Sequence, residues 1–284
     1  CLVGSEMCIR DRKYIVPALL GGMLTLQSCE HFLDTKPTET YSEELVWGSR
    51  STADAFVLRT YPDILGLYHD FWGDDQITLN TILRQSCPGE ARDLINREHD
   101  FGFNKFSIIR RCNLIIEQAS ASTALSDLDK KELVAEGKML RAMIYYYQAK
   151  HCGRVIWVDR VLQVDDEFNL PLTESIDRTY DLILSDLDDA IAGLPEEYPA
   201  GRANANAARA LKSEVCLTAA AYTTDATRKK TLWEQAVVAV DAIQGYSLDA
   251  NYGGMFNQEN SYSSTEIILA RYFSKENTLS LIHI

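Results

Sequence analysis

The sequence predicts an all-α protein, a tetratricopeptide-like solenoid of antiparallel helix pairs joined by irregular loops. From about Ser51 onward, apolar residues recur with the spacing of amphipathic helices, and capping residues bound the strongest of these segments. Leu114–Ile116 matches Leu182–Leu184, and Arg141-Ala142 matches Arg209-Ala210, both at an offset of 68 residues (182 − 114 and 209 − 141). This offset is twice the tetratricopeptide period of about 34 residues. Chance agreement between helical patterns is the alternative explanation.

The first clear helix is predicted to begin after Ser126, which opens a capping box with Asp129, and to stop at Gly153. A second helix is predicted from about Asp177 to Ala192, ended by Gly193 and Pro195. The predicted inward face of the first comprises Leu133, Leu140, Met143, Ile144 and Tyr147. That of the second comprises Tyr180, Ile183, Leu184, Leu187 and Ile191, with Asp181, Asp186, Asp188 and Asp189 toward solvent.

Two further helices are predicted in the second half of the chain. One runs from about Asn206 to Tyr222 and is rich in alanine, so neighbouring helix axes can approach it closely and we expect it to be internal. The other runs from about Leu232 to Ile243 and places Trp233, Ala236, Val237 and Val240 on one side. After these helices, Glu266–Ala270 is predicted to be a short strand or an extended segment.

The apolar run from Tyr14 to Leu26 is too short to span a bilayer but suits the core of a signal peptide. It closes on a lipobox-like Leu26-Gln27-Ser28-Cys29, which predicts Cys29 as the lipid-attachment residue and the first residue of the mature protein. A buried helix that happens to end in Ser-Cys is the alternative.

The predicted organisation follows from this leader. Residues 13–28 form the signal peptide, 29–45 the lipid anchor and tether, and 46–275 a helical domain. Residues 1–12 and 279–284 resemble translated sequencing adapters, so we expect a gene truncated at both ends.

Composition and motifs exclude several classes of function. A net charge of −13 without a basic stripe argues against nucleic acid as a partner. No metal-binding, nucleotide-binding or serine-nucleophile motif occurs, so we expect no cofactor, no metal and no catalytic residues. Calcium held by scattered loop carboxylates, without an EF-hand loop, is the alternative. The acidic runs Asp74-Asp75 and Asp165–Glu167 are read as solvated loop charge rather than a hydrolytic pair. Cys87, Cys112, Cys152 and Cys216 are read as small buried hydrophobes.

A loop in the first third of the chain combines aromatic and planar polar side chains. Aromatic faces suit the apolar side of a sugar ring, and carboxylate, amide and guanidinium groups suit its hydroxyls. The predicted substrate-binding residues are Tyr68, Trp72, Asp74, Asn80 and Arg84, with Phe71 and Asp75 beside them. The alternative is that these aromatics fill a core. The tyrosines Tyr145–Tyr147 are read as helix packing.

An ordered series of segments resembles the SusD/RagB family. It begins with Phe32–Pro37, covers roughly residues 26–275, and follows the lipobox. The matching segments are Glu136–Ala142, Tyr145–Tyr147, Gly153–Val155, Arg178–Ile191, Leu194-Pro195, Gly201-Arg202, Ala207–Lys212 and Ser264–Ile268. The chain departs from the family pattern at His151–Trp157, where Phe-Gly-Asp-Val-Pro is usual. Family members are also normally much longer, and much of their ligand-facing surface lies in the part beyond this chain.

This resemblance implies a lipoprotein of the Bacteroidetes outer membrane, exposed at the cell surface. It would capture a glycan or other nutrient without chemistry and deliver it to a SusC-like TonB-dependent transporter. Two alternatives remain open: a lipid-anchored scaffold that binds only protein, and a polysaccharide-processing enzyme. Neither the sequence nor the resemblance identifies the glycan.

Overall fold

The computed structural model describes residues 43–67, 104–253 and 264–272. Contacts between residues divide the chain into two units, residues 1–43 and 44–284. Apart from Glu43, all residues of the described helices belong to the second unit. Their bounds are α2 Glu43–Val46, α3 Arg50–Leu58, α4 Tyr61–Leu65, α7 Phe106–Ala121, α8 Asp127–Cys152, α9 Ile176–Gly193, α10 Ala205–Tyr222 and α11 Ala226–Asp241. No strand occurs in these ranges, which confirms the all-α prediction. None of these helices is both long and apolar enough to cross a bilayer.

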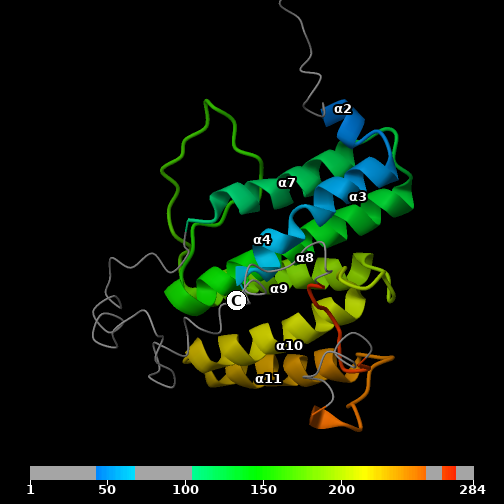
Figure 1. Cartoon of the computed structure of the whole chain (residues 1–284). Helices are drawn as coiled ribbons and strands as arrows, with labels where there is room; N and C mark the ends of the chain where they lie inside the picture. Colours follow the sequence, from blue (N-terminus) through cyan, green and yellow to red (C-terminus); the bar gives the residue numbers. More distant parts are fainter. Residues whose placement is uncertain (1–42, 68–103, 254–263, 273–284) are drawn as a thin grey trace, which may run out of the picture. The chain divides into compact units, whose positions relative to one another are not determined.

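The long helices stack in chain order, as a solenoid requires. Each of α8, α9 and α10 packs mainly against the helix before it and the helix after it, and α3 and α4 lie against α8 (Figure 1). The 68-residue offset pairs segments of α7 with α9 and of α8 with α10. The offset therefore leads from one helix pair to the next, and not across two tetratricopeptide repeats, because long α8 and the connection 153–175 lengthen the repeat.

Side-chain caps fix where the helices begin. Ser126, Ser175 and Asn204 each accept a hydrogen bond from the backbone N–H three residues later, at the starts of α8, α9 and α10. At the other end of α8, Gly153 adopts φ 73°, a left-handed value that favours glycine. The segment His151–Trp157 departs from the family pattern, but it keeps the glycine that ends this helix.

The start and the buried face of α11 differ from the prediction. The helix begins at Ala226, where the Asp225 carboxylate caps the N–H groups of Thr227 and Arg228. Its first turns are polar, so the apolar pattern did not reveal them. Leu232, Ala236 and Ala239 are buried. Of the residues predicted to share one side with Ala236, Trp233, Val237 and Val240 are about half exposed or more. The small alanines let α11 approach α10 closely, and the bulky residues occupy its other side.

The segment 264–272 contains turns and bends instead of the possible strand. Ser247 donates one backbone hydrogen bond to the Thr265 carbonyl (3.2 Å), but the Asp249 N–H is taken by the Glu266 carboxylate (2.5 Å). A ladder needs successive backbone pairs. The Glu266 side chain takes the next backbone N–H, so only one backbone pair forms and no strand ladder develops.

Two buried ionic clusters tie the helices together. In the first, Arg141 of α8 forms two hydrogen bonds with Asp186 of α9, both 2.7 Å, and a third with Asn113 of α7 (2.9 Å). Asp186 is 4% exposed, so its predicted position facing solvent was wrong. The helical period placed it beside the partly buried Asp181 and the exposed Asp188 and Asp189. An arginine from the neighbouring helix provides the partner that makes its burial possible.

The second cluster centres on Glu136 of α8, which is fully buried. It accepts hydrogen bonds from the Arg202 guanidinium (2.7 and 2.5 Å) and from the Tyr61 hydroxyl (2.5 Å). Arg202 also binds Asp54 (2.6 Å), which in turn accepts from Arg50 (2.9 Å). The cluster therefore joins α3 and α4 to α8 and to the connection that leads into α10.

The cysteines divide by burial. Cys112 and Cys216 are buried free thiols, as predicted, whereas Cys152 is exposed in the last turn of α8. Cys87 lies outside the described residues. Burial raises the pKa of the Cys112 thiol to about 12 and that of Cys216 to about 11, so both stay protonated and act as packing groups.

Candidate functional site

The residues that the sequence nominates for sugar binding, Tyr68, Trp72, Asp74, Asn80 and Arg84, lie outside the described residues, as does Cys29. Their role and the lipid attachment remain predictions. What the structure does describe is a different concavity, formed between the first turns of α7 and the long connection 153–175.

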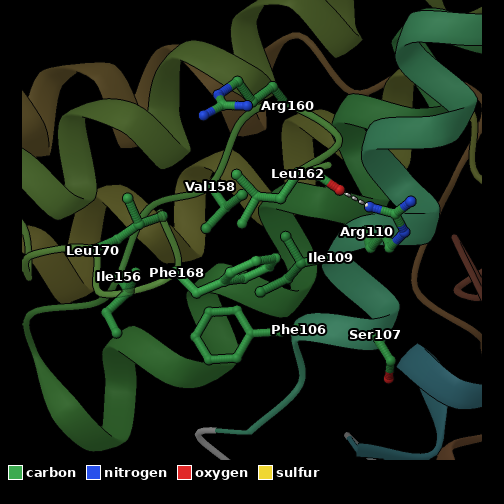
Figure 2. Close-up of a pocket in the computed structure, with 10 residues that line it drawn as sticks. All are labelled: Phe106, Ser107, Ile109, Arg110, Ile156, Val158, Arg160, Leu162, Phe168 and Leu170. Atoms are coloured by element: carbon green, nitrogen blue, oxygen red, sulfur yellow. Dashed lines mark hydrogen bonds between the residues drawn. The ribbon is translucent and has the colours of Figure 1, made fainter. Parts of the chain in front are cut away.

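This concavity is a pocket of about 350 Å³ with largely apolar walls (Figure 2). α7 contributes Phe106, Ser107, Ile109 and Arg110, and the connection contributes Ile156, Val158, Arg160, Leu162, Phe168 and Leu170. The connection supplies every second residue from 156 to 162, the alternation expected of an extended chain whose side chains point to opposite sides. The volume is within the range of small-molecule sites.

Buried side chains of α7 and α8 hold the wall of this pocket in place. The Asn113 amide donates to the carbonyls of Val158 and Arg160, both at 2.9 Å. The Val158 N–H donates to the Tyr145 hydroxyl (2.7 Å), and Arg141 donates to the Asp159 carbonyl (3.2 Å). Burial raises the pKa of the Tyr145 phenol, which keeps its proton. The pocket is therefore preformed and does not depend on a ligand for its shape.

Trp157 anchors the side of the connection that faces away from the pocket. Its ring stacks on Tyr145 with centroids 4.2 Å apart, and the Arg141 guanidinium lies 5.6 Å from the indole centroid. Tyr145 is fully buried in this arrangement, and Tyr146 bonds Glu214 and Thr218 (both 2.8 Å). Tyr145 and Tyr146 therefore pack helices, as predicted, whereas Tyr147 is only partly buried, and Tyr145 also positions the pocket wall.

Two arginines on the pocket lining differ in their partners. Arg160 is held by Asp166 through two hydrogen bonds (2.7 and 3.0 Å) and is neutralised by it. Arg110 donates to the Leu162 carbonyl (2.5 Å; dashed line in Figure 2), and no carboxylate in the described ranges pairs with it. One lining cation therefore lacks a fixed counter-charge.

The acidic run Asp165–Glu167 does not form a catalytic pair. The hydrogen bonds from Arg160 and from the Gln163 N–H hold the pKa of Asp166 below its usual value, so this carboxylate stays ionised and cannot serve as a general acid at neutral pH. Its two neighbours are exposed. Across the described part of the chain, no group of three His, Cys, Asp or Glu side chains is placed to hold a metal ion.

Sequence reasoning missed this pocket. Its residues come from a connection without helical period and from the first turns of a helix whose start had no recognisable cap: Lys105, at the N-cap of α7, makes no side-chain capping bond. The one usable signal was the alternation of apolar residues at Ile156, Val158 and Leu162, in a segment for which the sequence predicted no structure.

Comparison with known proteins identifies the fold. A SusD-like protein of Bacteroides ovatus is 26% identical over 172 residues, which are 59% of this chain and 31% of the relative. The SusD-like protein P25 of Formosa agariphila is 24% identical over 275 residues, 88% of this chain and 50% of the relative. The crystal structure of a Bacteroides fragilis SusD-like protein matches with a TM-score of 0.65 and 26% identity, covering 83% of this chain and 47% of that one. The chain is similar to SusD-like proteins in sequence and in fold.

The other comparisons agree in fold. A laminarin-binding SusD-like protein matches with a TM-score of 0.62 and 21% identity, over 77% of this SusD-like chain and 50% of its own. No family model matches the sequence. The chain spans half or less of the length of the two curated relatives.

Proposed function

We propose that this SusD-like chain captures oligosaccharide at the cell surface and binds it without turnover. The observation that carries the proposal is the family fold, because a protein on the same helical framework binds laminarin. The net charge of −13 favours a neutral ligand over an anionic polymer. The aromatic and amide side chains of the loop that contains Tyr68 and Arg84 have the chemistry that sugar rings and hydroxyls require.

Calorimetric titration with laminarin oligosaccharides and a panel of other neutral glucans tests this proposal. We expect saturable binding to at least one glycan and no change in its chain length on chromatography. Trp72→Ala should weaken that binding at least tenfold, because the loss of a stacking face removes the apolar contact with the ring. Trp233→Ala removes an exposed indole from α11, outside the segment predicted to bind sugar, and is the matched control.

The three functional classes give different results in this experiment. Binding of glycan without shorter products supports capture. Appearance of shorter products would favour the enzyme, and absence of binding to every glycan would favour the protein-binding scaffold. Undiminished binding by Trp72→Ala would place the sugar elsewhere.

We further propose a lipid anchor at Cys29 and delivery to a SusC-like TonB-dependent transporter in the outer membrane. The lipobox and the apolar run before it support the anchor. Labelling of expressing cells with radioactive palmitate should mark the wild-type protein and not Cys29→Ser. Co-purification of a TonB-dependent transporter with the anchored protein tests the partnership, and recovery of the protein from the cytosol would contradict both.

A further inference from the structure

We propose that the pocket between α7 and the 153–175 connection binds a small aromatic carboxylate, with the ring inside and the carboxylate at Arg110. This is a second site with a ligand class different from a neutral glycan. The site consists of residues that the structure describes, and its ligand binding does not depend on the proposed capture of oligosaccharide.

The pocket lining selects an apolar body. Seven of its ten residues are hydrophobic, and two of these are phenylalanines, Phe106 and Phe168. Phenyl rings favour edge-to-face or offset contact with another ring. A bare sugar would place several hydroxyls against these walls without hydrogen-bond partners, which disfavours it. An aromatic ring has no such groups to satisfy.

The charge at the rim selects a carboxylate. Arg160 is neutralised by Asp166, which leaves the Arg110 guanidinium as the lining cation without a carboxylate partner in the described ranges. Its bond to the Leu162 carbonyl uses one of its five N–H donors and fixes the side chain at the pocket. The remaining donors can bind a carboxylate through two parallel hydrogen bonds.

The size and rigidity of the pocket suit a ligand with one ring and a short acidic side chain. At roughly 30 Å³ per water, the volume of about 350 Å³ corresponds to about a dozen waters. The buried anchors Asn113 and Tyr145 keep the wall from collapsing into this space. Because the pocket is preformed, few side chains have to become ordered when a ligand binds, so the entropic cost of binding is small.

Titration of the full chain with 3-phenylpropionate, followed by calorimetry and by saturation-transfer NMR, tests the proposal. We expect saturable binding, and at least tenfold weaker binding of the uncharged analogue 3-phenylpropanamide. Arg110→Gln should remove this preference, whereas Arg178→Gln, an exposed arginine on α9, should keep it. Phe168→Ala should weaken both ligands, because Phe168 lies at the pocket; Val164→Ala, in the same connection but outside the lining, should not.

Phe168 and Arg110 are exposed, so these variants are expected to melt like the wild type, which a thermal unfolding curve checks. No saturable binding of 3-phenylpropionate would overturn the proposal, as would equal affinity of the wild type for the acid and its amide. Laminarin oligosaccharides should not displace the acid. Competition would show that the pocket is the glycan site and would also overturn it, whereas failure of glycan binding alone would leave this site standing.

Discussion

At the scale of single residues, the family-like segment Glu136–Ala142 is explained by burial. Glu136 and Arg141 are charged residues of α8 whose side chains are buried in the protein. Glu136 pairs with Arg202, and Arg141 pairs with Asp186. Two charges taken out of water are stable only when they are paired and hydrogen-bonded. The segment therefore specifies which neighbours α8 accepts.

Removal of one partner of the Arg141–Asp186 pair should be strongly destabilising. Arg141→Ala leaves the Asp186 carboxylate buried without its counter-charge, and we expect a loss of about 3–5 kcal/mol in the free energy of unfolding, measured by urea denaturation. The control is Lys138→Ala, which breaks a pair with the half-exposed Asp189 and should cost less than about 1 kcal/mol. Equal losses in the two variants would contradict the importance of burial.

At the scale of elements, two glycines set how closely helices approach. A Cβ at Gly137 would lie 2.9 Å from Ile116 Cγ1 of α7, and a Cβ at Gly193 would lie 2.4 Å from Ala135 Cβ of α8. Gly193 is the last residue of α9, in agreement with the helix end predicted there, and the close approach of Ala135 also requires a glycine at this position. At both positions glycine lowers the helix propensity but allows a neighbouring helix to approach closely.

We predict that Gly193→Ala destabilises the protein more than Gly137→Ala. At Gly137 the closest atom, Ile116 Cγ1, can move by a change of side-chain rotamer, and the nearest atom fixed to a backbone, Ile115 Cβ, lies at 3.3 Å. At Gly193 the closest atom is the Ala135 methyl at 2.4 Å, which is fixed to its backbone and can move only with α8. Overpacking costs about 1–3 kcal/mol, against a gain of about 1 kcal/mol in helix propensity at a helix interior. Chemical denaturation of the two variants checks the order, and the reverse order would refute this packing argument.

The features that adjacent residues determine could be predicted from the sequence, and those that depend on contacts between distant segments could not. The bounds of α8, α9 and α10 follow from caps and apolar period, which adjacent residues determine. The burial of Asp186 and the buried face of α11 depend on what the next helix presents, and a single helical pattern cannot reveal this. The pocket is formed by an irregular connection whose shape comes from Asn113 and Tyr145, far away in sequence.

At the scale of the whole molecule, the cluster around Glu136 connects the first helices to the last third of the solenoid. Asp54 of α3 reaches Arg202 across 148 residues of sequence. Burial alone would raise the pKa of Asp54, but hydrogen bonds from Arg202 and Arg50 outweigh it and hold the pKa below its usual value. Folding therefore favours the ionised carboxylate.

This linkage predicts an acid limit of stability. A carboxyl whose pKa is lower in the folded than in the unfolded state, near 3.9, adds stability above that pH and loses it as pH falls through the folded pKa. The melting temperature should therefore fall below about pH 4. In Asp54→Asn it should start lower at neutral pH and fall less steeply. Parallel pH profiles would exclude Asp54 as a contributor.

The outward side of α11 also gives the protein a built-in optical reporter. Trp233 is 52% exposed, whereas Trp47 is 7% exposed and Trp157 is stacked on Tyr145. Emission from the Trp233 indole responds to hydration, so anything that seats on this helix should shift the fluorescence to shorter wavelength. A Trp233→Phe protein would stay silent to the same event, which makes the surface readable without an attached dye.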